Sequence, residues 1–119
     1  MKIFSWLALA AMFAGCASPN GGDGRILDTH IHLYDTRRAG GVPWPPPEDD
    51  VLYRPTLPPH FDAVCRDNNV TATVIVEASG LVEDNQWVLD LVKHNPKRYV
   101  GVVGNLPVGT HEFAGHLKR

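Results

Sequence analysis

Polar and apolar residues alternate over positions 25–33, and this pattern predicts a β-strand. Residues two apart on a strand point to the same face, so Asp28, His30 and His32 share one face. The opposite face carries Leu27, Thr29, Ile31 and Leu33. We therefore expect a strand that packs through one face and presents ionisable groups on the other.

Two further strands are predicted from composition. The segment 70–77 is β-branched at most positions and ends in Glu77, which suits a strand buried on both faces. The apolar segment 99–103 predicts a third strand, which Gly104 follows.

Helical spacing of apolar residues predicts a helix after each strand. The first runs from Pro59 or His60 to Asn68 and the second over 83–94, where Asn95 and Pro96 stop it. Their apolar sides are expected to consist of Phe61, Val64 and Cys65 in the first, and Trp87, Val88, Leu91 and Val92 in the second. A further helix is expected to begin at Thr110.

Strands that alternate with helices imply parallel βαβ units with right-handed crossovers, so the fold class is α/β. The 119 residues provide about three such units. Three units can form an open three-layer structure but cannot close an eight-stranded barrel, which takes ~250 residues. The pattern thus predicts either a small open α/β protein or the front part of a larger fold.

A proline-rich segment over 34–59 separates the first strand from the first helix. It carries Trp44, Tyr53 and Arg54, which suit a polar, ring-shaped ligand, and His60 at the helix entry is a further candidate for substrate contact. The alternative is a floppy insertion with exposed aromatic side chains.

The N-terminus has the features of a secretion signal. Lys2 precedes the apolar run 3–13, and small residues lead to Cys16. This order resembles a bacterial lipoprotein signal, which implies a signal peptide over 1–15 and lipidation of Cys16. A flexible tether over 16–24 and a globular part over 25–119 would follow. Ala17 after the cysteine resembles an outer-membrane sorting signal, which implies an envelope protein facing the periplasm. An ordinary secretory signal with an incidental cysteine is the alternative.

Charge and cysteine content bear on two further properties, a nucleic-acid partner and an intrachain disulfide. The net charge is −2 and the basic residues are dispersed, so we expect no nucleic-acid partner. With Cys16 lipidated, Cys65 is the only other thiol, which excludes an intrachain disulfide and suits a small core residue.

The candidate chemistry centres on His30 and His32. Two imidazoles beside a carboxylate can form half of a divalent metal site or of a proton-transfer site. Asp28 is expected to orient a histidine or a backbone group, and Glu77 to be a further site residue. The alternatives are that the histidines are hydrogen-bonded interior residues and that Glu77 is a structural carboxylate paired with an arginine.

Several segments occur in an order that resembles a known family. They are Ile26-Leu27-Asp28-Thr29-His30-Ile31-His32-Leu33-Tyr34-Asp35, Trp44 in its proline-rich loop, Val74-Ile75-Val76-Glu77-Ala78, Glu83-Asp84-Asn85-Gln86-Trp87-Val88-Leu89, and Tyr99-Val100-Gly101-Val102-Val103-Gly104. Together they resemble the amidohydrolase-related TIM-barrel hydrolases, in the branch of sugar lactonases and pyrone-dicarboxylate lactonases.

The resemblance implies that the chain is the N-terminal portion of a (β/α)₈ barrel, with its site at the carboxyl ends of the strands. It implies catalytic roles for His30, His32 and Glu77. It also implies that His30 and His32 either hold a divalent metal such as zinc or manganese or contact the substrate carbonyl directly, because members of this branch differ in whether they need a metal. The implied reaction is hydrolysis of a cyclic ester by an activated water. The substrate is a small molecule, a lactone or a related carboxylate.

Two alternatives remain. One is a non-oxidative decarboxylase of the same superfamily, because the first-strand motif does not separate the two reactions. The other is a lipid-anchored binding or structural lipoprotein without catalysis, in which the histidines only pack. We expect the 119-residue chain alone to be inactive, because the family's remaining site residues lie on later strands.

Overall fold

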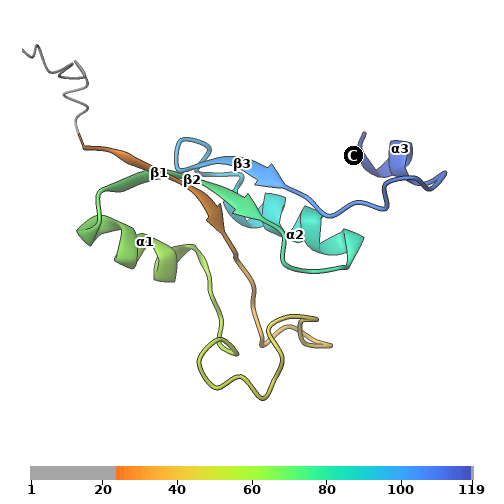
Figure 1. The fold of residues 1–119 in the computed structure, drawn as a ribbon, viewed down its shortest axis with the longest axis horizontal. Coiled ribbons are helices and arrows are strands. Elements are labelled where there is room, and N and C mark those ends of the chain that lie inside the picture. Colours follow the sequence, from red (N-terminus) through yellow and green to blue (C-terminus); the bar gives the residue numbers. More distant parts are fainter. Residues whose placement is uncertain (1–23, 119) are drawn as a thin grey trace, which may run out of the picture.

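The computed structural model describes residues 24–118 as an α/β unit in which strands and helices alternate (Figure 1). The strands are β1 (Ile26–Ile31), β2 (Val70–Val76) and β3 (Tyr99–Val103). The helices are α1 (Pro58–Asp67), α2 (Val82–Val92) and the short α3 (Phe113–His116). All strand pairs are parallel, in the order β1-β2-β3, which confirms the predicted alternation.

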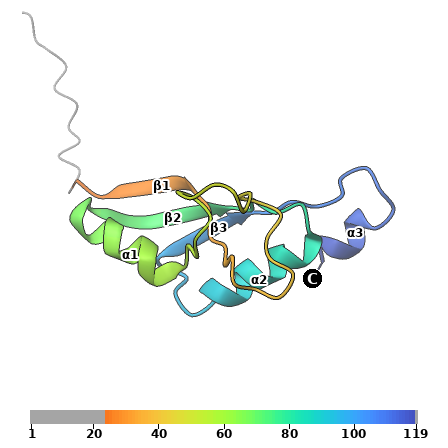
Figure 2. The same cartoon turned by 90° about the horizontal axis from the view of Figure 1, so that it is seen from below.

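Helices α1 and α2 lie on the same side of the sheet (Figure 2). The described part of the chain therefore has two layers, whereas an open α/β structure can have three. The reason is the strand order. Each right-handed crossover moves the chain one strand further in the same direction, so successive helices lie on the same face.

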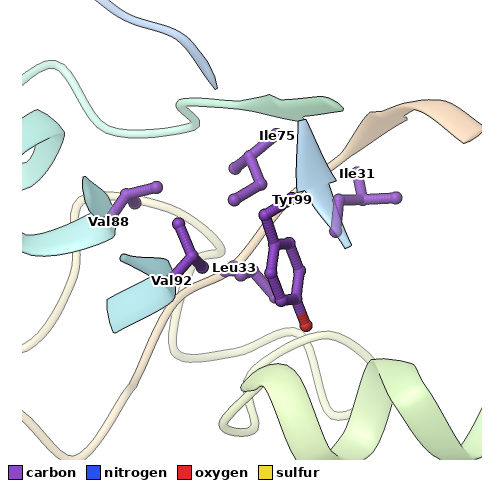
Figure 3. Packing of buried hydrophobic residues seen from close by; sticks show 6 residues of the cluster. All are labelled: Ile31, Leu33, Ile75, Val88, Val92 and Tyr99. Carbon is purple, nitrogen blue, oxygen red and sulfur yellow. The ribbon is translucent and has the colours of Figure 1, made fainter. Parts of the chain in front are cut away.

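The hydrophobic core lies between the sheet and these helices (Figure 3). Its buried members are Ile31, Leu33, Ile75, Val88, Val92 and Tyr99. Phe61, Trp87, Leu91 and Val102 pack against this cluster, as the helical spacing of α2 predicts. Cys65 is a free, buried thiol on α1, which confirms its interpretation as a small core residue.

The opposite face of the sheet is less buried than expected. Thr73 and Ile75 of β2 are buried, whereas the residues that alternate with them are half-buried or exposed. Leu27 on β1 is 52% exposed and Val64 on α1 is 63% exposed, although both belong to predicted apolar faces. The prediction that β2 is buried on both faces was therefore wrong for the residues that alternate with Thr73 and Ile75, because helices cover one side of the sheet only (Figure 2).

Several element ends differ from the sequence expectation. α3 begins at Phe113 and has 4 residues, so the helix expected from Thr110 is reduced to a single turn. α2 ends at Val92, two residues before the predicted end. Over residues 24–118, the structure has no helix that combines the length and the apolar character needed to span a membrane. The predicted signal segment over 1–15, and Cys16 with it, lies outside the described residues.

We predict that Ile75→Ala lowers the free energy of unfolding by about 2–5 kcal/mol, because the side chain is fully buried in the cluster. The matched control is Val51→Ala, whose side chain is 70% exposed in the long loop, with an expected change within about 0.5 kcal/mol. Urea denaturation of the two variants measures both values. Equal losses would contradict the assignment of the core.

Candidate functional site

The carboxyl ends of the three strands meet at one edge of the sheet, because all pairs are parallel. His32 follows the end of β1, Glu77 follows β2 and Gly104 follows β3. Ile31 pairs with Ile75, and Val76 pairs with Val103. The register therefore brings the predicted histidines and Glu77 to the same edge.

The two histidines face each other in an edge-to-face arrangement. Their ring centroids are 5.1 Å apart and the rings are inclined by 84°. Asp28 Oδ1 accepts a hydrogen bond of 3.1 Å from the backbone N–H of His30. Asp28 therefore orients a backbone group, as the sequence predicts.

One contact fixes the hydrogen-bonding roles of the His32 ring. Nδ1 lies 2.8 Å from the carbonyl oxygen of Val76 at the end of β2. A carbonyl oxygen only accepts hydrogen bonds, so Nδ1 must donate. In the neutral ring the lone pair is then on Nε2, which is the atom available to a substrate or a metal ion.

The proline-rich loop packs on this end of β1. The Trp44 ring lies 5.4 Å from the His32 ring and 5.6 Å from that of Tyr34. Tyr34 and Thr56 exchange two backbone hydrogen bonds of 2.9 and 2.8 Å, and the Tyr34 hydroxyl donates to the Leu52 carbonyl at 3.0 Å. Trp44 is thus held beside His32 by a hydrogen-bonded loop, which argues against a floppy insertion, and its role in ligand binding stays a prediction.

Glu77 is held at one carboxylate oxygen only. Oε1 accepts a hydrogen bond of 2.8 Å from the backbone N–H of Ser79, whereas Oε2 is buried with no partner in the described part of the chain. Burial raises the pKa of Glu77 and the charge of Asp84 adds to the effect, while backbone N–H groups of Ser79 and Ala78 oppose it. The expected alternative, a pairing of Glu77 with an arginine, is not observed among residues 24–118.

The sequence analysis did not identify a buried ion pair beside Glu77. An Arg38 guanidinium nitrogen lies 2.6 Å from Asp84 Oδ1, and the Asp84 side chain is 4% exposed. The guanidinium also lies 4.7 Å from the centroid of the Trp87 ring. These residues and Glu77 line a cavity of about 10 Å³, the space of one water molecule. No local spacing signals this pair, because its members are 46 residues apart.

Two of the predicted substrate residues lie elsewhere. Arg54 and His60 line a groove of about 860 Å³ beside α1, whose lining does not include Trp44, Glu77 or the histidine pair. His60 Nδ1 accepts a hydrogen bond of 3.1 Å from the backbone N–H of Leu57, the residue that precedes α1. The structure therefore brings together His30, His32, Trp44 and the β2 end, but not Arg54 and His60.

The number of metal-binding side chains at the site decides whether it can hold a metal ion. Zinc sites use three or four protein donors. His30 and His32 provide two, and no cluster of three or more histidine, cysteine or carboxylate residues that could hold a metal ion occurs within residues 24–118. The described residues alone therefore do not form a complete metal site.

Comparison with known proteins gives one structural match. The fold is similar to the crystal structure of an amidohydrolase from Burkholderia multivorans with bound zinc, with a TM-score of 0.68 and 22% sequence identity. The match covers 80% of this chain and 33% of that protein, so the chain spans a third of its length. No protein-family model and no curated protein sequence matches the chain. The match confirms the α/β fold, in which parallel strands alternate with helices.

The buried state of Glu77 leads to a prediction about pH. Its pKa is raised on folding, so the folded protein holds the Glu77 proton more tightly than the unfolded chain does. The contribution of this group to stability is therefore full below about pH 4.5 and decreases as the pH rises through the pKa of the folded state. We predict that Glu77→Gln, which keeps the acceptor for Ser79, weakens this decrease.

Denaturation midpoints at several values from about pH 4 to pH 7 measure the effect. Glu83→Gln is the matched control, since Glu83 is exposed on α2. The midpoint of this variant should change with pH as that of the wild type does. If the midpoint of Glu77→Gln changed with pH as much as that of the wild type, burial would not perturb the pKa of this carboxyl group.

Proposed function

We propose that the protein is a hydrolase of the amidohydrolase type that acts on a cyclic ester, such as a sugar lactone. The observation that carries this proposal is the pair of facing imidazoles at the end of β1, in a segment whose fold matches part of an amidohydrolase. The substrate class rests on the family resemblance of the motifs around His30, Glu77 and Trp44.

The geometry supports distinct roles for the side chains. His32 is oriented by Val76 so that Nε2 is available to polarise a substrate carbonyl, and His30 lies beside it. Glu77 is the proposed proton acceptor for water, and its raised pKa brings its proton affinity closer to neutral pH. The Trp44 ring next to His32 offers an apolar surface on which a sugar ring can stack.

The zinc ion belongs to the Burkholderia multivorans protein. In this chain the described donors are two imidazoles, which is fewer than a zinc site requires. The proposed steps therefore use the protein's own groups only. A divalent ion remains a proposal that depends on donors beyond those of residues 24–118.

We predict that His30→Ala and His32→Ala each lower lactone hydrolysis at least about 100-fold, with little change in folding. The protein expressed from its complete reading frame is assayed with a panel of sugar lactones. His111→Ala is the matched control, because the His111 side chain is 93% exposed and belongs to no part of the site. Near-normal turnover in either site variant would contradict the assigned roles.

The same assay separates the alternatives. Release of carbon dioxide from a carboxylate substrate, with lactones left intact, would indicate the decarboxylase instead. Binding of a ligand without turnover, unaffected by both histidine substitutions, would indicate the non-catalytic lipoprotein.

We further propose that a lipid on Cys16 anchors the protein to the outer membrane, facing the periplasm, because the residues before Cys16 resemble a lipoprotein signal. Cys16→Ser removes the thiol that would receive the lipid, and the protein should then leave the membrane fraction. Cell fractionation and labelling with a fatty-acid analogue measure this, with Cys65→Ser as the control. Membrane retention of Cys16→Ser would contradict the proposal.

A further inference from the structure

Two asparagines connect the exits of β2 and β3. Asn85 on α2 forms a reciprocal pair of hydrogen bonds with the backbone of Asn105, the second residue after β3. Its Oδ1 accepts from the Asn105 N–H at 2.8 Å, and its Nδ2 donates to the Asn105 carbonyl at 2.9 Å. The backbone partners determine the orientation of the Asn85 amide, because the Asn105 N–H can only donate to Oδ1 and the Asn105 carbonyl can only accept from Nδ2.

Gly104 allows this close approach. A Cβ atom at position 104 would lie 2.7 Å from Asn85 Oδ1, which is shorter than real Cβ contacts. Asn85 Nδ2 also donates to the Val82 carbonyl at 2.9 Å, so the side chain is held from its own helix as well. The loop after β3 is thus bound to the first turn of α2 at a fixed distance.

Asn105 extends the connection to the loop after β2. Its Nδ2 donates to the Ser79 carbonyl at 3.0 Å, and the Ser79 N–H donates to Glu77 Oε1 at 2.8 Å. Ser79 Oγ accepts from the Leu81 N–H at 3.0 Å. Ser79 is 7% exposed, and its N–H, carbonyl and hydroxyl oxygen are all engaged. The hydrogen bond of 2.8 Å that Glu77 Oε1 accepts therefore comes from a residue that Asn105 holds.

We propose that Asn85 and Asn105 are positioning residues, which fix Ser79 and through it the direction of the Glu77 carboxylate. The importance of that direction for turnover rests on the proposed function, whereas the fixing of Ser79 does not. Asn105 follows β3 and Asn85 lies in the first turn of α2, so the pair joins the loop after β3 to the segment after β2 that carries Glu77. Each asparagine acts through another residue and is not expected to touch the substrate.

The first experiment measures amide hydrogen exchange by NMR in the full chain. In Asn105→Ala and Asn105→Asp, the Ser79 amide should exchange at least about tenfold faster than in the wild type. The Ile75 amide, in the core strand, should change by less than about twofold. Asp keeps the size of Asn but has no N–H donor, so it should behave as Ala does. Wild-type protection of Ser79 in Asn105→Asp would overturn the proposal, and so would an equal loss at Ile75.

A second variant tests the same connection from the other side. Gly104→Ala places a methyl group against Asn85 Oδ1 and should also speed Ser79 exchange at least about tenfold. Gly101→Ala is the matched control on β3, because its Cβ would meet Val74 at an ordinary 3.7 Å. Equal exchange in the two glycine variants would overturn the role of Asn85.

The third measurement concerns turnover of a sugar lactone. Asn105→Asp should lower kcat about 10- to 100-fold with KM within about twofold, the pattern of a misdirected catalytic group. A change confined to KM would overturn the positioning role. If the wild type hydrolyses no lactone, the proposed function fails, while the exchange data still decide whether the asparagine pair fixes Ser79.

Discussion

β2 forms parallel hydrogen bonds with β1 on one side and with β3 on the other, and this pairing brings His30, His32 and Glu77 to one edge of the sheet. Parallel strands require that the chain return to the same end of the sheet before each new strand. Glu77 and Gly104, which lie 46 and 73 residues after Ile31, thereby reach the edge where His32 lies. The contact between His32 and the Val76 carbonyl is the direct product of that pairing.

The same order of strands makes the two faces of the sheet different, because helices cover one face and not the other. Successive right-handed crossovers put α1 and α2 on one side, where Ile31, Leu33 and Ile75 are buried (Figure 3). The side chains that alternate with these residues lie on the uncovered face. Alternation from His30 to Leu33 thus buries Ile31 and Leu33 and leaves the rings of His30 and His32 outside the core. Before Ile31 the register of β1 is irregular, and Leu27 and Thr29 are exposed.

The sequence predicts those parts of the structure that depend on short-range periodicity. The three strands, the apolar side of α2 and the shared face of His30 and His32 follow from spacings of two to four residues. The number of layers does not follow from the sequence, because the side on which a helix packs depends on strand order, which local patterns do not contain. Val64 has the right spacing for an apolar side, yet it is exposed because α1 has nothing against that part of its surface.

The long-range polar contacts could not be predicted from the sequence. Arg38 pairs with Asp84 across 46 positions, and Asn105 reaches Asn85 across 20. The local sequence around each of these side chains is equally compatible with a position on the exposed surface. His60 shows the converse, since its position at a helix entry suggested a ligand contact while its ring nitrogen accepts from the Leu57 backbone.

The bond between His32 Nδ1 and the Val76 carbonyl links the direction of a side chain to the register of a strand pair. Nδ1 can donate to this carbonyl only while Ile31 lies beside Ile75, because a slip of one residue would move Val76 by about 3.3 Å along the strand. The orientation of the His32 ring is therefore set by the backbone of β2, and it depends on how the strands pair as well as on the side chains around the ring.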